Sequence, residues 1–227
     1  MVEEEIQLRI SDDVVKNDSG KTVEDSELSN TIYYKIEEKL KDPKTYFIVG
    51  LTIFILFALI GLAYAEFQIH NEPAQYTKNI DTISRQVTHK IKWNSEFSVM
   101  IGIFKNNLTV GFILFTITLI SSSLVSFLFY MFNGGVLGYV LGRKLSLHSL
   151  MLILPHGIIE IPAIVYFGWI GTRFNLIDEL IIKRKSISEM KSSLVPMLKH
   201  LTFASLLLLV SAFVEAFVTG KIAGLFS

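Results

Sequence analysis

The residues best suited to chemistry lie in one short run, from Leu154 to Ala163, which reads LPHGIIEIPA. His156 and Glu160 are four residues apart, so an α-helix places both side chains on the same face. Both lie near the middle of a long apolar stretch. A charged carboxylate at the centre of a bilayer costs about 2.5–3.5 kcal/mol. We therefore expect Glu160 to face protein or water.

Three interpretations of this His/Glu pair stay open. The pair is a buried hydrogen-bonded pair that fixes helix register, or a lipid, ion or proton site, or a metal site for hydrolysis. Two ligands are too few for a closed metal site. No His-Glu-x-x-His motif occurs, and the nearest other histidine, His148, is eight residues away. We expect no metal and no cofactor.

Signatures of catalysis are also missing from the sequence. It contains no serine in a nucleophile-elbow context, no phosphate-binding glycine loop and no cysteine. These motifs mark the common acyl-transfer, nucleotide-dependent and thiol enzymes. We expect a protein that is not an enzyme.

Two prolines predict that the helix carrying the pair is kinked. Proline lacks an N–H group, so Pro162 deprives the Ile158 carbonyl of its helical donor. If the helix runs through Pro155, the Met151 carbonyl loses its donor in the same way, two turns earlier. Broken helices persist in hydrocarbon only against protein or a wet cavity. Gly157 is expected to let another backbone approach. The polar face should point into a helical bundle.

The distribution of charge shows what kind of bundle this is. The 227 residues carry 21 basic and 21 acidic side chains. Four stretches, 46–65, 107–142, 145–172 and 200–220, hold only Glu160 and Glu215 among them. A membrane helix needs about 20 apolar residues. The sequence predicts an all-α, polytopic transmembrane bundle, and its zero net charge argues against a nucleic-acid partner.

Positive charge decides the number of crossings. The stretch 107–142 is long for one helix and short for two, with breaks at Ser121-Ser122-Ser123 and Asn133-Gly134-Gly135. If it crosses twice, ten basic residues fall inside and eight outside; a single crossing gives seven and eleven. We expect five spans in the cell membrane, with a cytoplasmic N-terminus.

The polar segments suggest three further features. Residues 1–27 form an acidic leader that we expect to be disordered, and 28–45 form an amphipathic juxtamembrane helix closed by Asp42-Pro43; the transmembrane domain is 46–227. Residues 80–97 and 176–198 each place apolar side chains on one helical face, as interfacial helices do. A connector that packs on its own bundle explains these two segments equally well. The loop 67–106 and the segment 175–198 are the expected surfaces for partner proteins.

Small residues mark a second unusual element. Gly134, Gly138 and Gly142 recur every four residues, a spacing that lets two membrane helices pack closely. Asn133 lies at the expected bend, where it would cap a helix or reach His156. Glu215, near the end of the last stretch, is expected to be structural and to pair with Lys221.

The sequence resembles the stage II sporulation protein M family. The resemblance rests on Phe104-Lys105-Asn106-Asn107, on Asn133-Gly134-x3-Gly138, and on Leu154-Pro155-His156-Gly157-x2-Glu160-x2-Ala163. It covers roughly 97–173, and the flanking spans fit in position. Pro162, directly before Ala163, departs from the family pattern and adds a kink.

The resemblance implies a five-span membrane protein without known catalytic activity. In endospore formers the namesake works as the membrane anchor of a complex with two cell-wall hydrolases, proteins D and P of the same stage. It therefore implies a scaffold for membrane or envelope proteins, with a homo-oligomer also open. The alternative from the residues is a small transporter or lipid-handling protein that uses His156 and Glu160, with Asn133 as an additional site residue.

Overall fold

The computed structural model describes residues 23–71, 95–143, 147–176, 178, 180, 187–219 and 221–222. Over these residues the chain is helical and contains no strand. The helices are α2 (Val23–Leu40), α3 (Pro43–Asn71), α5 (Glu96–Ile120), α6 (Ser123–Arg143), α7 (Leu147–Arg173) and α8 (Ile187–Val214). A π-helical turn, η2 (Glu215–Thr219), continues α8. The prediction of an all-α protein is confirmed.

Five of the described helices are long and apolar enough to cross a membrane. These spans are Pro43–Asn71, Glu96–Ile120, Ser123–Arg143, Ile153–Arg173 and Lys191–Thr219. Large apolar side chains such as Ile48, Phe132 and Ile158 are exposed on the outside of the bundle. In a membrane protein such side chains face lipid, so their exposure fits the five-span prediction.

The structure shows how the stretch 107–142 holds two spans. The first span begins at Glu96, before the charge-free stretch, and ends at Ile120. Ser121 caps it, and its N–H donates to the Thr118 carbonyl. The second begins at Ser123. The expected bend at Asn133 is wrong, because α6 is continuous there and the Asn133 side chain donates to the Phe129 carbonyl at 2.8 Å.

Helices α3 and α6 pack closely through glycines. A Cβ atom added to Gly138 would lie 2.8 Å from the Cα of Ala58, and one on Gly142 would lie 2.7 Å from the Cβ of Ala65. Gly61 of α3 faces Tyr139 of α6 in the same way. Small residues let the two helices come into close van der Waals contact. This contact stabilises the pair, because the hydrophobic effect does not drive helix association in lipid.

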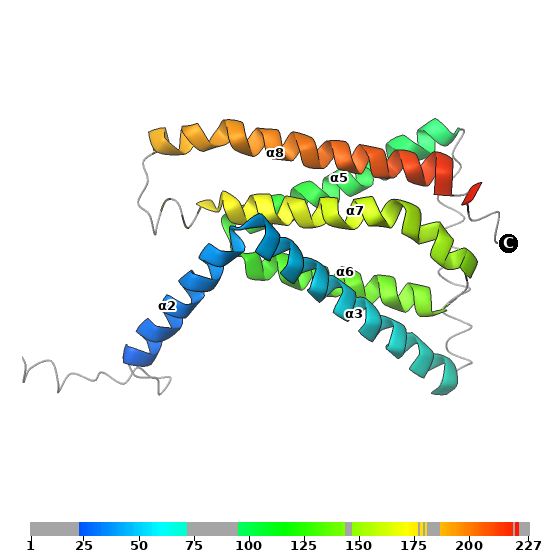
Figure 1. The fold of residues 1–227 in the computed structure, drawn as a ribbon, viewed down its shortest axis with the longest axis horizontal. Helices are drawn as coiled ribbons and strands as arrows, with labels where there is room; N and C mark the ends of the chain where they lie inside the picture. The colour runs from blue at the N-terminus through cyan, green and yellow to red at the C-terminus, as the bar shows by residue number, and fades with distance from the viewer. Residues whose placement is uncertain are drawn as a thin grey trace, which may run out of the picture. The chain divides into compact units, whose positions relative to one another are not determined.

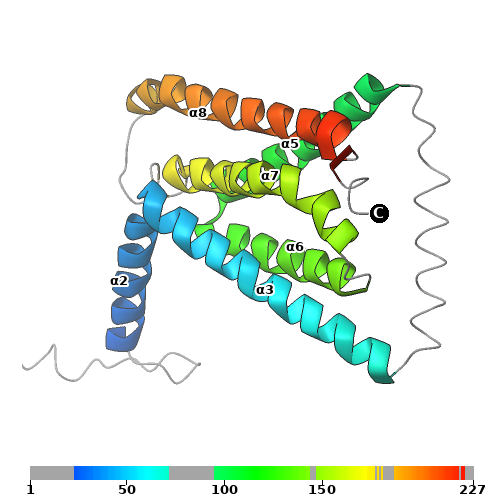
Figure 2. The ribbon, with the colours of Figure 1, turned by 45° about the vertical axis from the view of Figure 1, so that its right-hand side comes forward.

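Helix α7 lies at the centre of the bundle and contacts α3, α5, α6 and α8. Figure 2 shows it between α8 on one side and the α3–α6 pair on the other. Its C-terminal half is buried, with Ala163, Phe167 and Ile170 fully inaccessible. Both prolines lie within α7, and its ribbon bends toward the N-terminal end (Figure 1). This bend agrees with the kink that Pro155 and Pro162 predict.

Hydrogen bonds fix the end of the bundle where α3 begins. The Lys41 ammonium group pairs with Asp178, and the Trp169 indole donates to the Lys41 carbonyl at 3.0 Å. The Asn175 amide donates to the carbonyls of Thr118 and Ser121 at 2.9 and 2.8 Å. These bonds satisfy orphan carbonyls at the end of α5 and hold this end of α7 in place.

The polar segments are described in part. Helix α2 begins at Val23, earlier than the expected residue 28, and exposes Ile32, Tyr33, Tyr34 and Ile36. Residues 187–198, expected as an interfacial helix, belong to the same helix as the last span. Leader residues 1–22, residues 72–94 of the 67–106 loop, and 177, 179 and 181–186 of the 175–198 segment lie outside the described residues.

Candidate functional site

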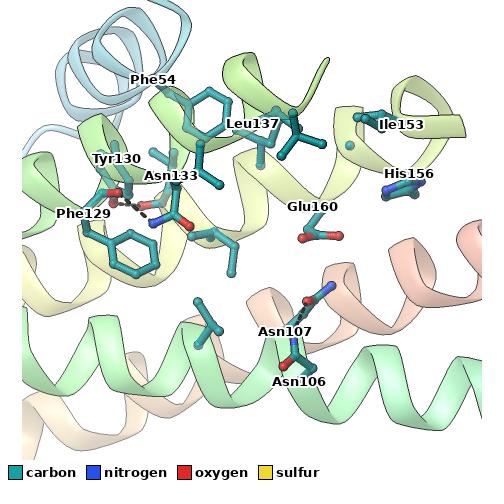
Figure 3. Close-up of a pocket in the computed structure, with 17 residues that line it drawn as sticks. Phe54, Asn106, Asn107, Phe129, Tyr130, Asn133, Leu137, Ile153, His156 and Glu160 are labelled. Carbon is teal, nitrogen blue, oxygen red and sulfur yellow. Dashed lines mark hydrogen bonds between the residues drawn. The ribbon is translucent and has the colours of Figure 1, made fainter. Parts of the chain in front are cut away.

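A cavity of about 360 Å³ lies among α3, α5, α6 and α7. Its walls are mostly apolar and include Phe54, Val110, Phe129, Leu137, Ile153 and Ile164. Polar side chains reach it from three helices: Asn106 and Asn107 from α5, Asn133 from α6, and His156 and Glu160 from α7 (Figure 3). The cavity therefore joins an apolar wall to a polar cluster within the membrane-spanning part of the fold.

A third ionisable residue joins the predicted pair. The possible ligand atoms of His156, Glu160 and Glu215 all lie within 4.8 Å of one another. The His156 Nε2 atom is 3.9 Å from a Glu215 carboxylate oxygen. The expectation that Glu215 is only structural must therefore be revised, because the end of α8 brings it to His156.

Hydrogen bonds set the orientation of the His156 ring. The Thr219 hydroxyl donates to the Val214 carbonyl at 3.1 Å, so its oxygen is left to accept. This oxygen lies 3.5 Å from His156 Nδ1, so it can accept a hydrogen bond from an Nδ1–H group. In that tautomer the lone pair lies on Nε2, the nitrogen that faces Glu215.

Glu215 and Thr219, which both lie beside His156, are the first and last residues of the π-helical turn η2. A π-helical turn bonds residues five apart, and such turns occur often at functional sites. Thr219 bonds to Val214, five residues earlier, by its side chain. One turn before η2, the Ser211 hydroxyl donates to the His156 carbonyl at 3.1 Å and ties α8 to α7.

Asparagines of α5 complete the cluster on the opposite side. Asn107 is buried, and its side chain is a hydrogen-bonding neighbour of the Glu160 carboxyl group. The Asn106 amide donates to the Asn107 side-chain oxygen at 3.2 Å. Both asparagines line the cavity (Figure 3).

Two predicted site residues have different roles from those expected. Asn133 lines the cavity, but its side-chain amide donates to the Phe129 carbonyl of the same helix. Between Asn133 and His156 the structure shows no hydrogen bond. Gly157 is buried, yet a Cβ there would meet only Ile153 and Ile161 of α7, at 3.7 and 3.9 Å. Gly157 thus leaves room in the cavity and does not admit a neighbouring backbone.

The sequence contained a signal for Glu215 but none for Thr219 or Ser211. Glu215 is one of the two charged residues in the four apolar stretches, and Glu160 is the other. Their shared rarity is the property that marks them as a pair. Thr219 and Ser211 are ordinary polar residues of membrane helices, so only the packing identifies them.

The charges of His156, Glu160 and Glu215 indicate what this cluster can bind. Two carboxylates and one imidazole lie close together, and the His156 and Glu215 side chains are only 14% and 34% exposed. Like charges in a poorly solvated site require a proton, a cation or hydrogen-bond donors to balance them. The cluster is therefore suited to hold a cation or a proton, or to meet the polar group of a ligand in the cavity.

The fold and site define a class: a polytopic α-helical membrane protein with a polar cluster inside its bundle. The family model described as stage II sporulation protein M matches residues 47–220. The chain belongs to the stage II sporulation protein M family. The match includes the flanking spans as well as the motifs that carry the resemblance.

Comparison with individual proteins assigns no function to the chain. An uncharacterized protein from Methanocaldococcus jannaschii is 31% identical over 175 residues, which cover 74% of this chain and 71% of that protein. No solved structure matches the chain.

Proposed function

We propose that the protein binds an amphiphilic ligand, of the lipid type, in its intramembrane cavity. The observation that carries the proposal is the cavity of about 360 Å³ with apolar walls and the His156, Glu160 and Asn107 side chains on it. Ligand sites in proteins are typically apolar clefts of this size with a few convergent polar groups. The role requires no catalytic step.

The apolar and polar parts of the cavity wall indicate how such a ligand would lie. Its polar head is placed beside Glu160 and His156, where the Asn107 amide supplies a further hydrogen-bonding group. Its acyl or isoprenoid part lies along residues such as Phe54, Phe129 and Leu137. This arrangement buries apolar area and still satisfies the polar side chains.

Filling the cavity tests the proposal. In Gly157→Leu the new side chain enters the cavity, because Gly157 lines it and a Cβ there meets no other helix. Mass spectrometry of protein purified in mild detergent should find about one amphiphile per wild-type chain and at least a tenfold loss in Gly157→Leu, a loss of about 1.4 kcal/mol in affinity.

A neighbouring position supplies the control. Ile158 follows Gly157 on the same helix but is 68% exposed on the outer face. Ile158→Phe adds volume there and should leave the bound amphiphile in place. An equal amount of amphiphile in Gly157→Leu and Ile158→Phe, or none in the wild type, would refute the cavity proposal.

We also propose a second function, a membrane scaffold for other membrane or envelope proteins, as family membership suggests. The last span candidate, Lys191–Thr219, has 29 residues and so is about 44 Å long at 1.5 Å per residue. The hydrocarbon core is only about 30 Å thick. The first turns of α8, with Leu194, Val195 and Leu198 exposed, therefore extend past the core and offer a surface to a partner.

A further inference from the structure

We propose that His156, Glu160 and Glu215 bind a divalent transition-metal ion of the Zn²⁺ class. The ligands are His156 Nε2 and one oxygen from each carboxylate, and the open coordination position faces the cavity. This inference goes beyond the lipid proposal and does not depend on it, because the three side chains suffice to bind the ion.

The distances between the ligand atoms fit a metal centre after small movements. Tetrahedral ligands at about 2.1 Å from zinc lie about 3.4 Å from one another. The His156 Nε2 and Glu215 oxygen atoms are 3.9 Å apart, and no pair in the cluster exceeds 4.8 Å. Rotation of the carboxylate groups closes such gaps without moving a helix, since terminal carboxylate torsions are broad.

The surroundings of His156 fit those of a metal-ligating histidine. A ligating imidazole coordinates through one nitrogen and usually donates its other N–H to a fixed acceptor. Here the Thr219 oxygen accepts from Nδ1, because its own proton goes to the Val214 carbonyl. The Nε2 lone pair is directed to the side of the ring where Glu215 lies.

The net charge of the cluster also favours a dication. When both are deprotonated, the two carboxylates carry two negative charges in a part of the chain that spans the membrane. One divalent ion neutralises both. The mixed nitrogen and oxygen ligands favour Zn²⁺, Mn²⁺ or Fe²⁺ over Mg²⁺ and Ca²⁺, which prefer oxygen alone.

The sequence marked Glu215 as unusual but did not place it beside His156 and Glu160. We expected no metal because His156 and Glu160 are only two ligands. Glu215 lies on another helix and completes a set of three with an open position. Three protein ligands with an open fourth position are typical of zinc sites that exchange a water or a ligand.

The test uses the full chain in detergent, stripped with chelator and then titrated with Zn²⁺. Isothermal calorimetry and elemental analysis after desalting should give about one Zn²⁺ per chain. His156→Ala, Glu160→Gln and Glu215→Gln should each lower the affinity at least a hundredfold. Matched controls are Glu96→Gln and His70→Ala, because both residues are exposed and lie outside the cluster.

A fourth variant separates metal binding from folding. Thr219→Val keeps the three ligands and removes only the acceptor for Nδ1, so it should weaken Zn²⁺ binding about 10- to 100-fold. A Co²⁺-loaded sample should show the visible bands of a low-symmetry site, and these bands should change in Thr219→Val. Zinc that stays bound when all three ligands are replaced, or a wild type that takes up none, overturns the proposal.

The two proposals fail in different ways. Wild-type protein that carries an amphiphile but takes up no Zn²⁺ refutes the metal site alone. Protein that binds Zn²⁺ stoichiometrically but carries no amphiphile refutes the lipid proposal alone.

Discussion

At the residue scale, the polar cluster depends on side chains that each have a defined partner. Ser211 bonds to the His156 carbonyl and Thr219 lies beside the His156 ring. Asn107 lies beside Glu160. A buried polar group that loses its partner costs about 1–3 kcal/mol. The cluster is therefore held in one geometry by its neighbours, as a binding site requires.

Asp42 offers a residue-scale prediction outside the spans. It directly precedes α3, and its carboxylate accepts from the Thr45 N–H and the Thr45 hydroxyl, both at 2.8 Å. The backbone bond and then the hydroxyl bond hold the pKa of Asp42 below its ordinary value of 3.8, because they stabilise the charged form. Asp42 thus caps the first turn of α3 as a carboxylate.

The sign of the pH effect follows from the direction of this shift. A lowered pKa in the folded state contributes stability above pH 3.8, and this contribution is lost as pH falls through the lower folded value. Asp42→Asn keeps a side-chain acceptor but cannot titrate. Thermal melts should show Tm falling more steeply below about pH 4 in the wild type than in Asp42→Asn. Parallel Tm curves for the two proteins would contradict this role.

At the element scale, the close pair α3–α6 forms one side of the cavity. Phe54 of α3 lines it beside Asn133, Val136 and Leu137 of α6. The separation of these helices is set where Gly138 meets Ala58 and Gly142 meets Ala65. The glycines therefore control the width of the cavity although none of these four residues lines it.

A pair of glycine substitutions tests this packing. Gly138→Ala places a methyl group against the backbone of Ala58, whereas at Gly135, three residues away, the nearest atom to an added Cβ is 3.9 Å distant. Gly138→Ala should lose about 1–3 kcal/mol, typical of overpacking, and Gly135→Ala should melt like the wild type. The measurement is the Tm in detergent. Equal Tm values for both variants would show that the glycines do not set the distance.

At the scale of the whole molecule, the direction of the helices decides where the cluster lies. His156 and Glu160 are in the first half of α7, and Glu215 follows the end of α8. Both segments lie at the end of the bundle where α3 finishes (Figure 1). If the N-terminus lies in the cytoplasm, as the positions of Lys and Arg predict, the cluster faces the outer half of the membrane.

Single-cysteine labelling tests this orientation, and the native chain contains no cysteine that would interfere. Substitutions at Lys39 and Lys191 should react only with reagents on the cytoplasmic side, and substitutions at Asn71 and Lys221 only with reagents outside. The opposite pattern would invert the topology and place the cluster in the inner half.

The same variants test the scaffold proposal. A photocrosslinker attached at residue 191 should capture a defined membrane or envelope protein, since the first turns of α8 extend past the hydrocarbon core. The matched control is residue 221, at the other end of the last span. No product, or the same products from both sites, would contradict a partner surface at the start of α8.

Much of the fold could be predicted because it depends on local properties of the chain. Charge is excluded from hydrocarbon, so the charge-poor stretches marked the spans, and the positions of Lys and Arg favoured five crossings. The sequence did not indicate where α5 begins, because its first ten residues include the charged Glu96 and Lys105. These residues therefore lie outside the charge-free stretch that marked the span. The bend predicted at Asn133 was wrong, because α6 is continuous there and its glycines, Gly134 and Gly138, pack against α3 instead of breaking the helix.

By itself, the sequence determined that this is a membrane protein and that His156 and Glu160 share one helical face. Both follow from short-range rules, the apolar length of a span and the helical repeat. Only the tertiary structure decided that Glu215, 55 residues after Glu160, completes the cluster, and that Asn107 and Gly157 border a cavity. These contacts join different helices, and the packing of side chains across the bundle fixes them; no sequence spacing encodes them.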